Sequence, residues 1–135
     1  MDKAAFSLDN YRFEKANIDF TKKISNNIEM EIKPSGKFIA EKSVYELKFY
    51  FYAFNKDIKN SFVIIECIAL FRFENKLNFE NIPSYFYRNS IAIIFPYIRA
   101  FISTITLQTN TPPIILPTMN LSSLESLLKE NTTQI

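Results

Sequence analysis

The sequence lacks histidine and tryptophan, and its 135 residues include one cysteine, Cys67, and one glycine, Gly36. Without histidine there is no imidazole general base and no Ser-His-Asp triad. A single cysteine forms neither an intrachain disulfide nor a zinc cluster, and a single glycine rules out Gly-rich phosphate-binding loops. We therefore predict that the protein is not an enzyme and has no catalytic residues, no metal site and no cofactor.

The sequence also has no large excess of charge of one sign. It contains 16 basic and 14 acidic residues, for a formal net charge of +2. A nucleic-acid-binding protein carries a clustered basic surface, so no nucleic-acid partner is expected. The most apolar segment, Ile91–Leu107, is shorter than the roughly 20 apolar residues of a membrane helix and contains Pro96 and Arg99. The first ten residues contain no apolar core of signal-peptide length. We expect a soluble cytoplasmic protein without membrane insertion.

Apolar and aromatic side chains are what the sequence has in abundance. Hydrophobic residues make up 47% of the chain and aromatic residues 16%, including 14 phenylalanines. Such a composition supports a packed core and argues against intrinsic disorder. We predict one domain over residues 1–135, with an ordered core at 5–130 and a frayed tail at 131–135.

Four segments show the alternation of apolar and polar residues that is typical of half-buried strands. The first needs one or two bulges to keep its alternation, and a turn at Pro34-Ser35-Gly36 interrupts the second. A short polar linker joins the last two, which indicates an antiparallel hairpin. The predicted strands are Ala5–Phe20, a segment beginning at Ile28, Val44–Asn55 and Ser61–Phe73.

The second half of the chain is predicted to be helical. Apolar residues recur at helical spacing along Ile91–Gln108, and a shorter apolar face follows in Ser122–Lys129. Residues 81–89 form either a short helix or an irregular lead-in. The predicted fold class is α+β, with a four-stranded antiparallel sheet packed on one long helix and a short C-terminal helix.

No residue pattern marks an active site, and the excess of apolar surface points instead to binding. Cys67 falls on the inward face of its strand, where it is expected to be a small core residue. The opposite face of the hairpin is apolar as well, with Tyr50, Tyr52 and Phe62 among its residues. This face is either covered by another part of the chain or exposed as an interaction site.

Residues 94–124, IFPYIRAFISTITLQTNTPPIILPTMNLSSL, contain a distinctive arrangement of motifs. The segment resembles the SecB family of protein-export chaperones, whose main helix has a Phe-Pro-Tyr-Ala-Arg-Glu core and is followed by a Leu-Ala-Pro-Val-Asn-Phe loop. A weaker, collinear similarity to the family's first strand covers Tyr11–Asn17. The matching positions near the main helix are Phe95, Pro96, Tyr97, Arg99, Pro112, Pro113, Leu116, Pro117 and Asn120.

The resemblance implies a SecB-like subunit that assembles as a dimer of dimers, with the main helices between two sheets. Family members are ATP-independent holdases that bind unfolded polypeptides or preproteins and deliver them to the SecA motor. We accordingly predict a homo-oligomer, most simply a tetramer, that functions in protein export and transport as a chaperone.

Two sets of residues are predicted to carry these interactions. Aromatic and aliphatic side chains offer contact area with loose geometric demands, which suits unfolded clients. The predicted client-binding residues are Tyr50, Tyr52, Phe62, Tyr85, Phe86, Ile114, Ile115 and Leu116. The predicted oligomer interface is the apolar stripe Ile94, Ile98, Phe101, Ile102 and Ile105.

The sequence departs from the family in the features that dock on SecA. Glu14 matches the acidic residue of the first strand, which makes it the candidate translocase contact, but Ile64 lies where the family has a second acid. The tail lacks the cysteine and histidine with which family members bind zinc. SecA is therefore a doubtful partner. The alternatives are a SecB-like chaperone dedicated to one partner, such as an antitoxin, a carrier of an apolar ligand, or a purely structural oligomer.

Overall fold

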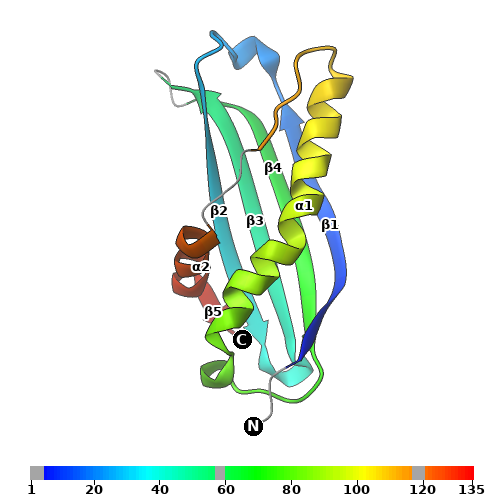
Figure 1. The fold of residues 1–135 in the computed structure, drawn as a ribbon, viewed down its shortest axis with the longest axis vertical. Coiled ribbons are helices and arrows are strands. Elements are labelled where there is room, and N and C mark those ends of the chain that lie inside the picture. The colour runs from blue at the N-terminus through cyan, green and yellow to red at the C-terminus, as the bar shows by residue number, and fades with distance from the viewer. Residues whose placement is uncertain (1–4, 57–59, 117–120) are drawn as a thin grey trace.

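The computed structural model describes residues 5–56, 60–116 and 121–135 and has an α+β fold, in which a long helix crosses one face of a sheet (Figure 1). The long elements follow the predicted order, four strands and then two helices. Three short 3-10 turns, η1–η3, connect them. The elements are β1 (Phe6–Ile18), η1 (Phe20–Lys22), β2 (Ile28–Ile39), η2 (Ala40–Lys42), β3 (Val44–Asn55), β4 (Ser61–Phe73), η3 (Phe79–Asn81), α1 (Ser84–Gln108), α2 (Leu121–Glu130) and β5 (Thr132–Gln134).

The sheet has the strand order β1-β4-β3-β2-β5. The first four strands pair antiparallel, as predicted, whereas β5 adds a fifth strand parallel to β2. The expectation that residues 131–135 fray is therefore wrong. The Gly36 N–H donates to the Asn131 carbonyl at 3.1 Å, and the Ile135 N–H donates to the Phe38 carbonyl at 2.9 Å. These bonds attach the tail to the edge of β2.

The first strand contains two irregularities, where its sequence predicts one or two bulges. Its register with β4 shifts between Leu8 and Asn10 and again between Phe13 and Lys15. Each shift inserts one extra residue, so Asp9 and Glu14 occupy bulges. The bulges keep Leu8 and Phe13 among the residues that pack against the core.

Pro34-Ser35-Gly36 lies inside β2, so the prediction of a turn there is wrong. The register between β2 and β3 is unbroken from Ile28 to Ile39. Proline is tolerated in a strand when its missing N–H would face the outer edge of the sheet. The Gly36 N–H bonds to the tail, so the backbone N–H groups of even-numbered residues of β2 point to the outer edge. Pro34 is one of these residues, and its missing N–H would have pointed to the same edge.

Gly36 is explained by a neighbouring side chain. The Tyr45 hydroxyl lies where a Cβ at residue 36 would be. The Thr132 hydroxyl donates its proton to the Leu128 carbonyl at 2.6 Å. It therefore acts as the acceptor for the Tyr45 hydroxyl, which lies 2.6 Å away. The absence of a side chain at residue 36 thus lets a buried tyrosine connect the sheet to the C-terminal tail.

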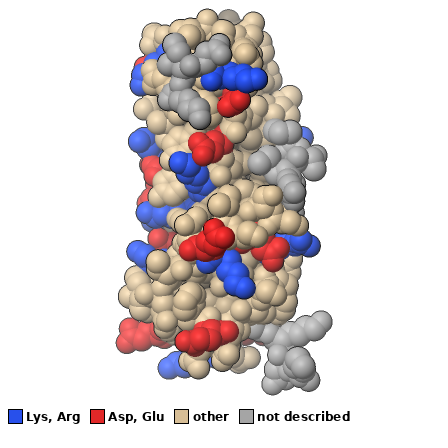
Figure 2. Space-filling model, turned by 90° about the vertical axis from the view of Figure 1, so that its left-hand side faces the viewer, with Lys and Arg blue, Asp and Glu red and all other residues tan. Residues whose placement is uncertain are grey.

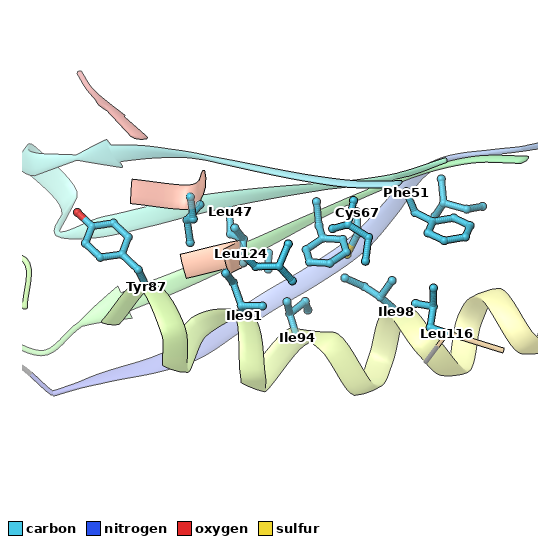
Figure 3. Close-up of a cluster of buried hydrophobic side chains, with 14 of the residues drawn as sticks. Leu47, Phe51, Cys67, Tyr87, Ile91, Ile94, Ile98, Leu116 and Leu124 are labelled. Atoms are coloured by element: carbon cyan, nitrogen blue, oxygen red, sulfur yellow. The ribbon is translucent and has the colours of Figure 1, made fainter. Parts of the chain in front are cut away.

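Helix α1 begins at Ser84, directly after Pro83. It therefore includes residues 84–89, which the sequence predicted as either a short helix or an irregular lead-in. Pro96 lies inside the helix, where it removes one backbone hydrogen bond. The sheet-facing side is apolar and fully buried, and its side chains interdigitate with those of the sheet (Figure 3). This stripe consists of Phe86, Ile91, Ile94, Ile98 and Ile102.

By length and composition α1 would also be able to cross a membrane, and a third of its most apolar window is buried inside the structure. Core helices pass the same test. Ile91, Ile94 and Ile98 pack here on the sheet with none of their surface exposed, which is the arrangement of a core helix.

Candidate functional site

The candidate site is a half-open pocket of about 330 Å³ near the C-terminal end of α1, far from both termini (Figure 1). Four parts of the chain form it: residues 20–26, the start of β2, Phe62 at the start of β4, and residues 112–115. Most of its surface is apolar, and Lys23 contributes a charge. The lining residues are Phe20, Lys23, Asn26, Ile28, Met30, Phe62, Pro112, Pro113, Ile114 and Ile115.

A buried asparagine holds the first wall in place. Asn55, at the end of β3, is 1% exposed. Its Oδ1 accepts from the Ile24 and Ser25 N–H groups at 3.3 Å, and its Nδ2 donates to the Lys22 carbonyl at 2.8 Å. These three bonds satisfy the amide and fix the loop between β1 and β2 against the sheet.

The same loop is fixed at its start by Asp19. The Asp19 N–H donates to the Phe62 carbonyl at 2.8 Å, which continues the pairing of β1 with β4. Its carboxylate accepts from the Thr21 hydroxyl and N–H. The hydroxyl bond lowers the pKa of Asp19 below its usual value. The loop thus begins with an ordered turn that carries Phe20 toward the pocket.

The second wall is anchored to the last turns of α1. The Thr106 hydroxyl donates to the Ile102 carbonyl at 2.7 Å and accepts from the Ile114 N–H at 2.8 Å. The Ser103 hydroxyl donates to the Ile114 carbonyl at 3.2 Å. Ile114 is thereby turned inward, and the next residue, Ile115, leaves 59% of its surface exposed at the rim.

Three of the predicted client-binding residues meet in this pocket. Phe62, Ile114 and Ile115 line it together, although they come from β4 and from the segment after α1. Phe62 itself is only 1% exposed, so it forms part of the pocket floor. Pro117 and Asn120, which matched the family's loop motif, lie outside the described residues.

Two other predicted client-binding residues are fully buried in the subunit. Phe86 packs its ring against Phe6, Tyr45 and Phe73, with ring centroids 4.7–4.9 Å apart. Leu116 is likewise without exposed surface. A client cannot contact either side chain in this conformation, so both predictions are corrected to core residues. Each lies on the inward side of its segment, which a single sequence does not reveal.

The remaining three predicted residues lie away from the pocket. Tyr50 and Tyr52 are half-buried on the face of the sheet opposite α1, with nearly parallel rings 6.5 Å apart. Burial, followed by the nearby Glu66, raises the pKa of Tyr52. Tyr85 is exposed at the beginning of α1, at the other end of the molecule.

The predicted interface stripe is divided between core and surface. Ile94, Ile98 and Ile102 pack inside the subunit with no exposed surface, which removes them from direct contact with another chain. Phe101 and Ile105 are half-buried, and the Phe101 ring stacks on Phe13 of β1 at 3.8 Å. The solvent side of α1 also exposes large apolar residues, namely Tyr85, Ile93, Tyr97 and Leu107.

Glu14, the candidate translocase contact, occupies the second bulge of β1 and is exposed. Its carboxylate lies 3.0 Å from the Arg12 guanidinium. The ion pair offsets the negative charge that a basic partner would recognise. Within the described ranges, no three His, Cys, Asp or Glu side chains are grouped so that they could hold a metal ion.

Sequence reasoning missed the pocket residues contributed by the first half of the chain. Phe20 was assigned to the end of a strand, and Ile28 and Met30 to an ordinary half-buried face. One sequence signal was available, because Phe20 is a large apolar residue at the start of a polar loop. It does not indicate what the loop packs against, so the pocket depends on the tertiary arrangement.

Similarity to known proteins is found in the fold of this chain. No protein-family model matches the chain. A segment of 48 residues is 52% identical to an uncharacterised protein of Methanocaldococcus jannaschii, and the match covers 33% of this chain and 31% of that protein. The chain therefore matches less than a third of the length of this curated relative.

Among solved structures, the chain is similar to a SecB-like chaperone of Mycobacterium tuberculosis, solved in complex with a ChAD peptide from the HigA1 antitoxin. The TM-score is 0.63 with 18% identity, over 85% of this chain and 88% of that one. A protein of unknown function from Streptococcus agalactiae superimposes with a TM-score of 0.39 and 11% identity, over 84% and 94% of the two chains. The similarity to the mycobacterial chaperone shows that the described chain has a SecB-like fold, as its sequence motifs implied.

Proposed function

We propose that this protein is an ATP-independent, cytoplasmic molecular chaperone, without enzymatic activity, that binds unfolded or unassembled polypeptide segments. The observation that carries the proposal is the apolar pocket between the β1–β2 loop and residues 112–115, on a SecB-like fold. Unfolded chains expose apolar side chains that are buried in native proteins. Burying one such side chain contributes about 1.5–3 kcal/mol, which favours binding without nucleotide hydrolysis.

The shape of the pocket supports a polypeptide as the ligand. Its walls are two chain segments fixed by hydrogen bonds from Asn55 and Thr106, so the surface is ordered before a client arrives. The rim is open and exposes Ile115 and Met30, which gives an extended chain access from outside. Preformed apolar surfaces of this kind bind with a smaller loss of conformational entropy.

An aggregation assay tests this proposal. Wild-type protein, without ATP, is expected to suppress the aggregation of a chemically unfolded, reduced client, as followed by light scattering. Ile115→Ser should weaken suppression several-fold, because it removes an exposed apolar side chain from the rim. Ile135→Ser is the matched control, since Ile135 is 69% exposed and does not line the pocket.

Two results of this assay would count against the proposal. If wild-type protein fails to suppress aggregation, the chaperone function is wrong. If Ile115→Ser and Ile135→Ser are equally active, the client does not use this pocket.

A chaperone dedicated to one partner is the second candidate, and one observation in this chain favours it over general export. The acidic contact expected for SecA is reduced to Glu14, which is paired with Arg12. The structurally similar mycobacterial chaperone was solved with an antitoxin peptide. We propose that one dedicated polypeptide is the partner here, and purification of the tagged protein from its own organism would test it: one stoichiometric companion chain supports the proposal, and a broad range of clients contradicts it.

We also propose that the subunit forms a homo-oligomer, most simply a tetramer. The solvent side of α1 supports this proposal because it exposes the large apolar side chains of Ile93, Tyr97 and Leu107. A helix with apolar residues on both sides is normally covered on both sides.

A further inference from the structure

The face of the sheet opposite α1 contains a second pocket, half-open and about 300 Å³ in volume, which we call the outer pocket. It lies where β5 runs beside β2, near the C-terminus (Figure 1). Strands β2 and β3 and the C-terminal tail all contribute to it, and it shares no lining residue with the candidate pocket. The lining residues are Ser35, Gly36, Lys37, Glu46, Lys48, Tyr50, Asn131 and Thr133.

The strand register places the polar side chains of the outer pocket next to one another. Side chains alternate between the two faces of a strand, so Lys48 lies on the same face as Tyr50, away from α1. Lys48 is directly opposite Ser35 on β2, and Lys37 is directly opposite Thr133 on β5. Side chains at opposite positions have Cβ atoms about 5 Å apart. The outer pocket therefore brings two ammonium groups and two hydroxyl groups together.

Lys48 is a half-buried cation with no charged residue directly opposite it. Its neighbours in register are Ser35 on β2 and Ile68 on β4. A partly desolvated ammonium group is stabilised by a nearby anion, and in the described part of the chain no carboxylate forms an ion pair with Lys48. The cations of the ion pairs between described residues are Arg12, Lys33, Arg72 and Arg88.

Glu46 limits the charge of the anion that fits the outer pocket. It is the one acid among the described lining residues and lies directly opposite Lys37, so it offsets one of the two lysines. One excess positive charge remains, that of Lys48. A singly charged ligand matches it better than a phosphate dianion, whose second charge would be repelled by Glu46. The volume of the outer pocket is at the lower end of the range for small-molecule sites.

The uncharged groups of the outer pocket suit a carboxylate with an apolar part. Ser35, Asn131 and Thr133 can donate hydrogen bonds from hydroxyl or amide groups to carboxylate oxygens. Among the described residues, none of these three side chains has a hydrogen-bond partner. The Tyr50 ring forms an apolar wall beside them.

From these observations we infer that the outer pocket binds a small organic carboxylate, whose oxygens are held between Lys48 and the hydroxyl groups of Ser35 and Thr133. The apolar part of the ligand lies beside Tyr50. This site is additional to the pocket proposed for clients and does not depend on the chaperone function. Because Thr133 belongs to the tail and Ser35 to β2, the bound ligand also holds the tail on the sheet.

Benzoate is the probe, and nuclear magnetic resonance of the isotope-labelled full chain is the measurement. At constant ionic strength, benzoate should shift the backbone amide signals of residues 35–37, 46–50 and 131–133 saturably. We expect a Kd on the order of 1–10 mM, which is usual for a ligand of this size. Benzyl alcohol, which is neutral and of similar shape, should produce no saturable shifts. Equal shifts with benzyl alcohol, or no shifts with benzoate, would overturn the inference.

Inorganic phosphate distinguishes a carboxylate site from a general oxyanion site. It carries more negative charge and has no apolar part to place beside Tyr50, so it should bind the outer pocket more weakly than benzoate. Phosphate that shifts the same signals with equal or higher affinity contradicts the assignment to carboxylates.

A pair of lysine variants separates a specific contact from the general effect of charge. Lys48→Met removes the ammonium group and should weaken benzoate binding about tenfold. Lys15→Met is the matched control, because Lys15 is exposed on the same face of the sheet, opposite Glu66, and does not line the outer pocket. This control should bind benzoate like the wild type. Equal affinities of the two variants would rule out a site built on Lys48.

Hydrogen exchange at Gly36 provides an independent measurement. The Gly36 N–H donates to the Asn131 carbonyl at 3.1 Å, so its exchange requires the tail to leave β2. At a benzoate concentration about ten times its Kd, a ligand that requires the docked tail should slow this exchange about tenfold. Thr133→Val removes one hydroxyl and should weaken benzoate binding about fivefold. Unchanged exchange at saturating benzoate would show that the tail is not part of the site and contradict the inference.

Discussion

Cys67 lies in the middle of β4 with 1% of its surface exposed, on the face covered by α1 (Figure 3). Burial raises the pKa of its thiol from 9.0 to about 11. A thiolate is the reactive form of cysteine, and at neutral pH this thiol is protonated and covered. Cys67 is thus a small core residue, as its position in the strand pattern indicated.

The raised pKa predicts a loss of stability in alkali. The unfolded thiol ionises near pH 9 and the folded thiol near pH 11, so its contribution is complete below pH 9 and is lost as pH rises between these values. By about pH 10 the free energy of unfolding should fall by about 1.4 kcal/mol because of this group. Urea denaturation at pH 8 and pH 10 measures the fall.

Cys67→Ala is the control for this prediction. The variant removes the thiol, so its stability should decline less between the two pH values than that of the wild type. Part of the decline should persist, because burial also raises the pKa of Tyr45 and of Tyr87. An identical decline in both proteins would show that Cys67 is not responsible.

At the scale of single elements, the two sides of α1 have different roles. Ile98 is fully buried against the sheet, whereas Ile93 leaves 38% of its surface exposed on the other side. The same substitution at these two positions therefore separates packing within the subunit from contact between subunits.

We predict that Ile98→Asp unfolds the subunit and that Ile93→Asp leaves it folded but dissociated. An unpaired carboxylate in the core costs several kcal/mol, which is comparable to the whole stability of a small domain. Circular dichroism reports folding, and light scattering reports the molar mass. The homo-oligomer is contradicted if the wild type is a monodisperse monomer at micromolar concentration.

At the scale of the whole molecule, positive and negative side chains are interspersed, as one side of the molecule shows (Figure 2). The net charge is +2 for the whole chain. Such a surface provides no strong field of one sign for a highly charged partner. Specificity in partner choice then depends on local surfaces such as the pocket.

We predict that chelators leave the melting temperature and the aggregation suppression of this protein unchanged, and that SecA binds weakly or not at all. Zinc requires thiolate or imidazole ligands, and the only cysteine of the chain is in β4. Thermal denaturation and the aggregation assay, each with and without chelator, measure the first effect, and titration calorimetry against SecA of the same organism, with and without chelator, measures the second. Tight binding that a chelator abolishes would contradict the prediction.

Sequence periodicity and motifs were sufficient for the main elements of this protein. Alternation in the first four strands and helical spacing in α1 predict the α+β class, and even the two bulges of β1 follow from slips in its pattern. The motif around Phe95, Pro96 and Tyr97 adds the SecB-like fold. These features are local, or are shared by a family, so one sequence is enough to identify them.

The tertiary structure alone decided which apolar side chains are accessible and which chain segments meet. Phe86 and Ile115 are both apolar, yet one is buried by five neighbouring rings and the other forms the rim of the pocket. Gly36 and Pro34 have the composition of a turn, but the Tyr45 ring and the sheet edge make them parts of a strand. Contacts between segments far apart in the chain determine these outcomes, and local residue patterns do not encode them.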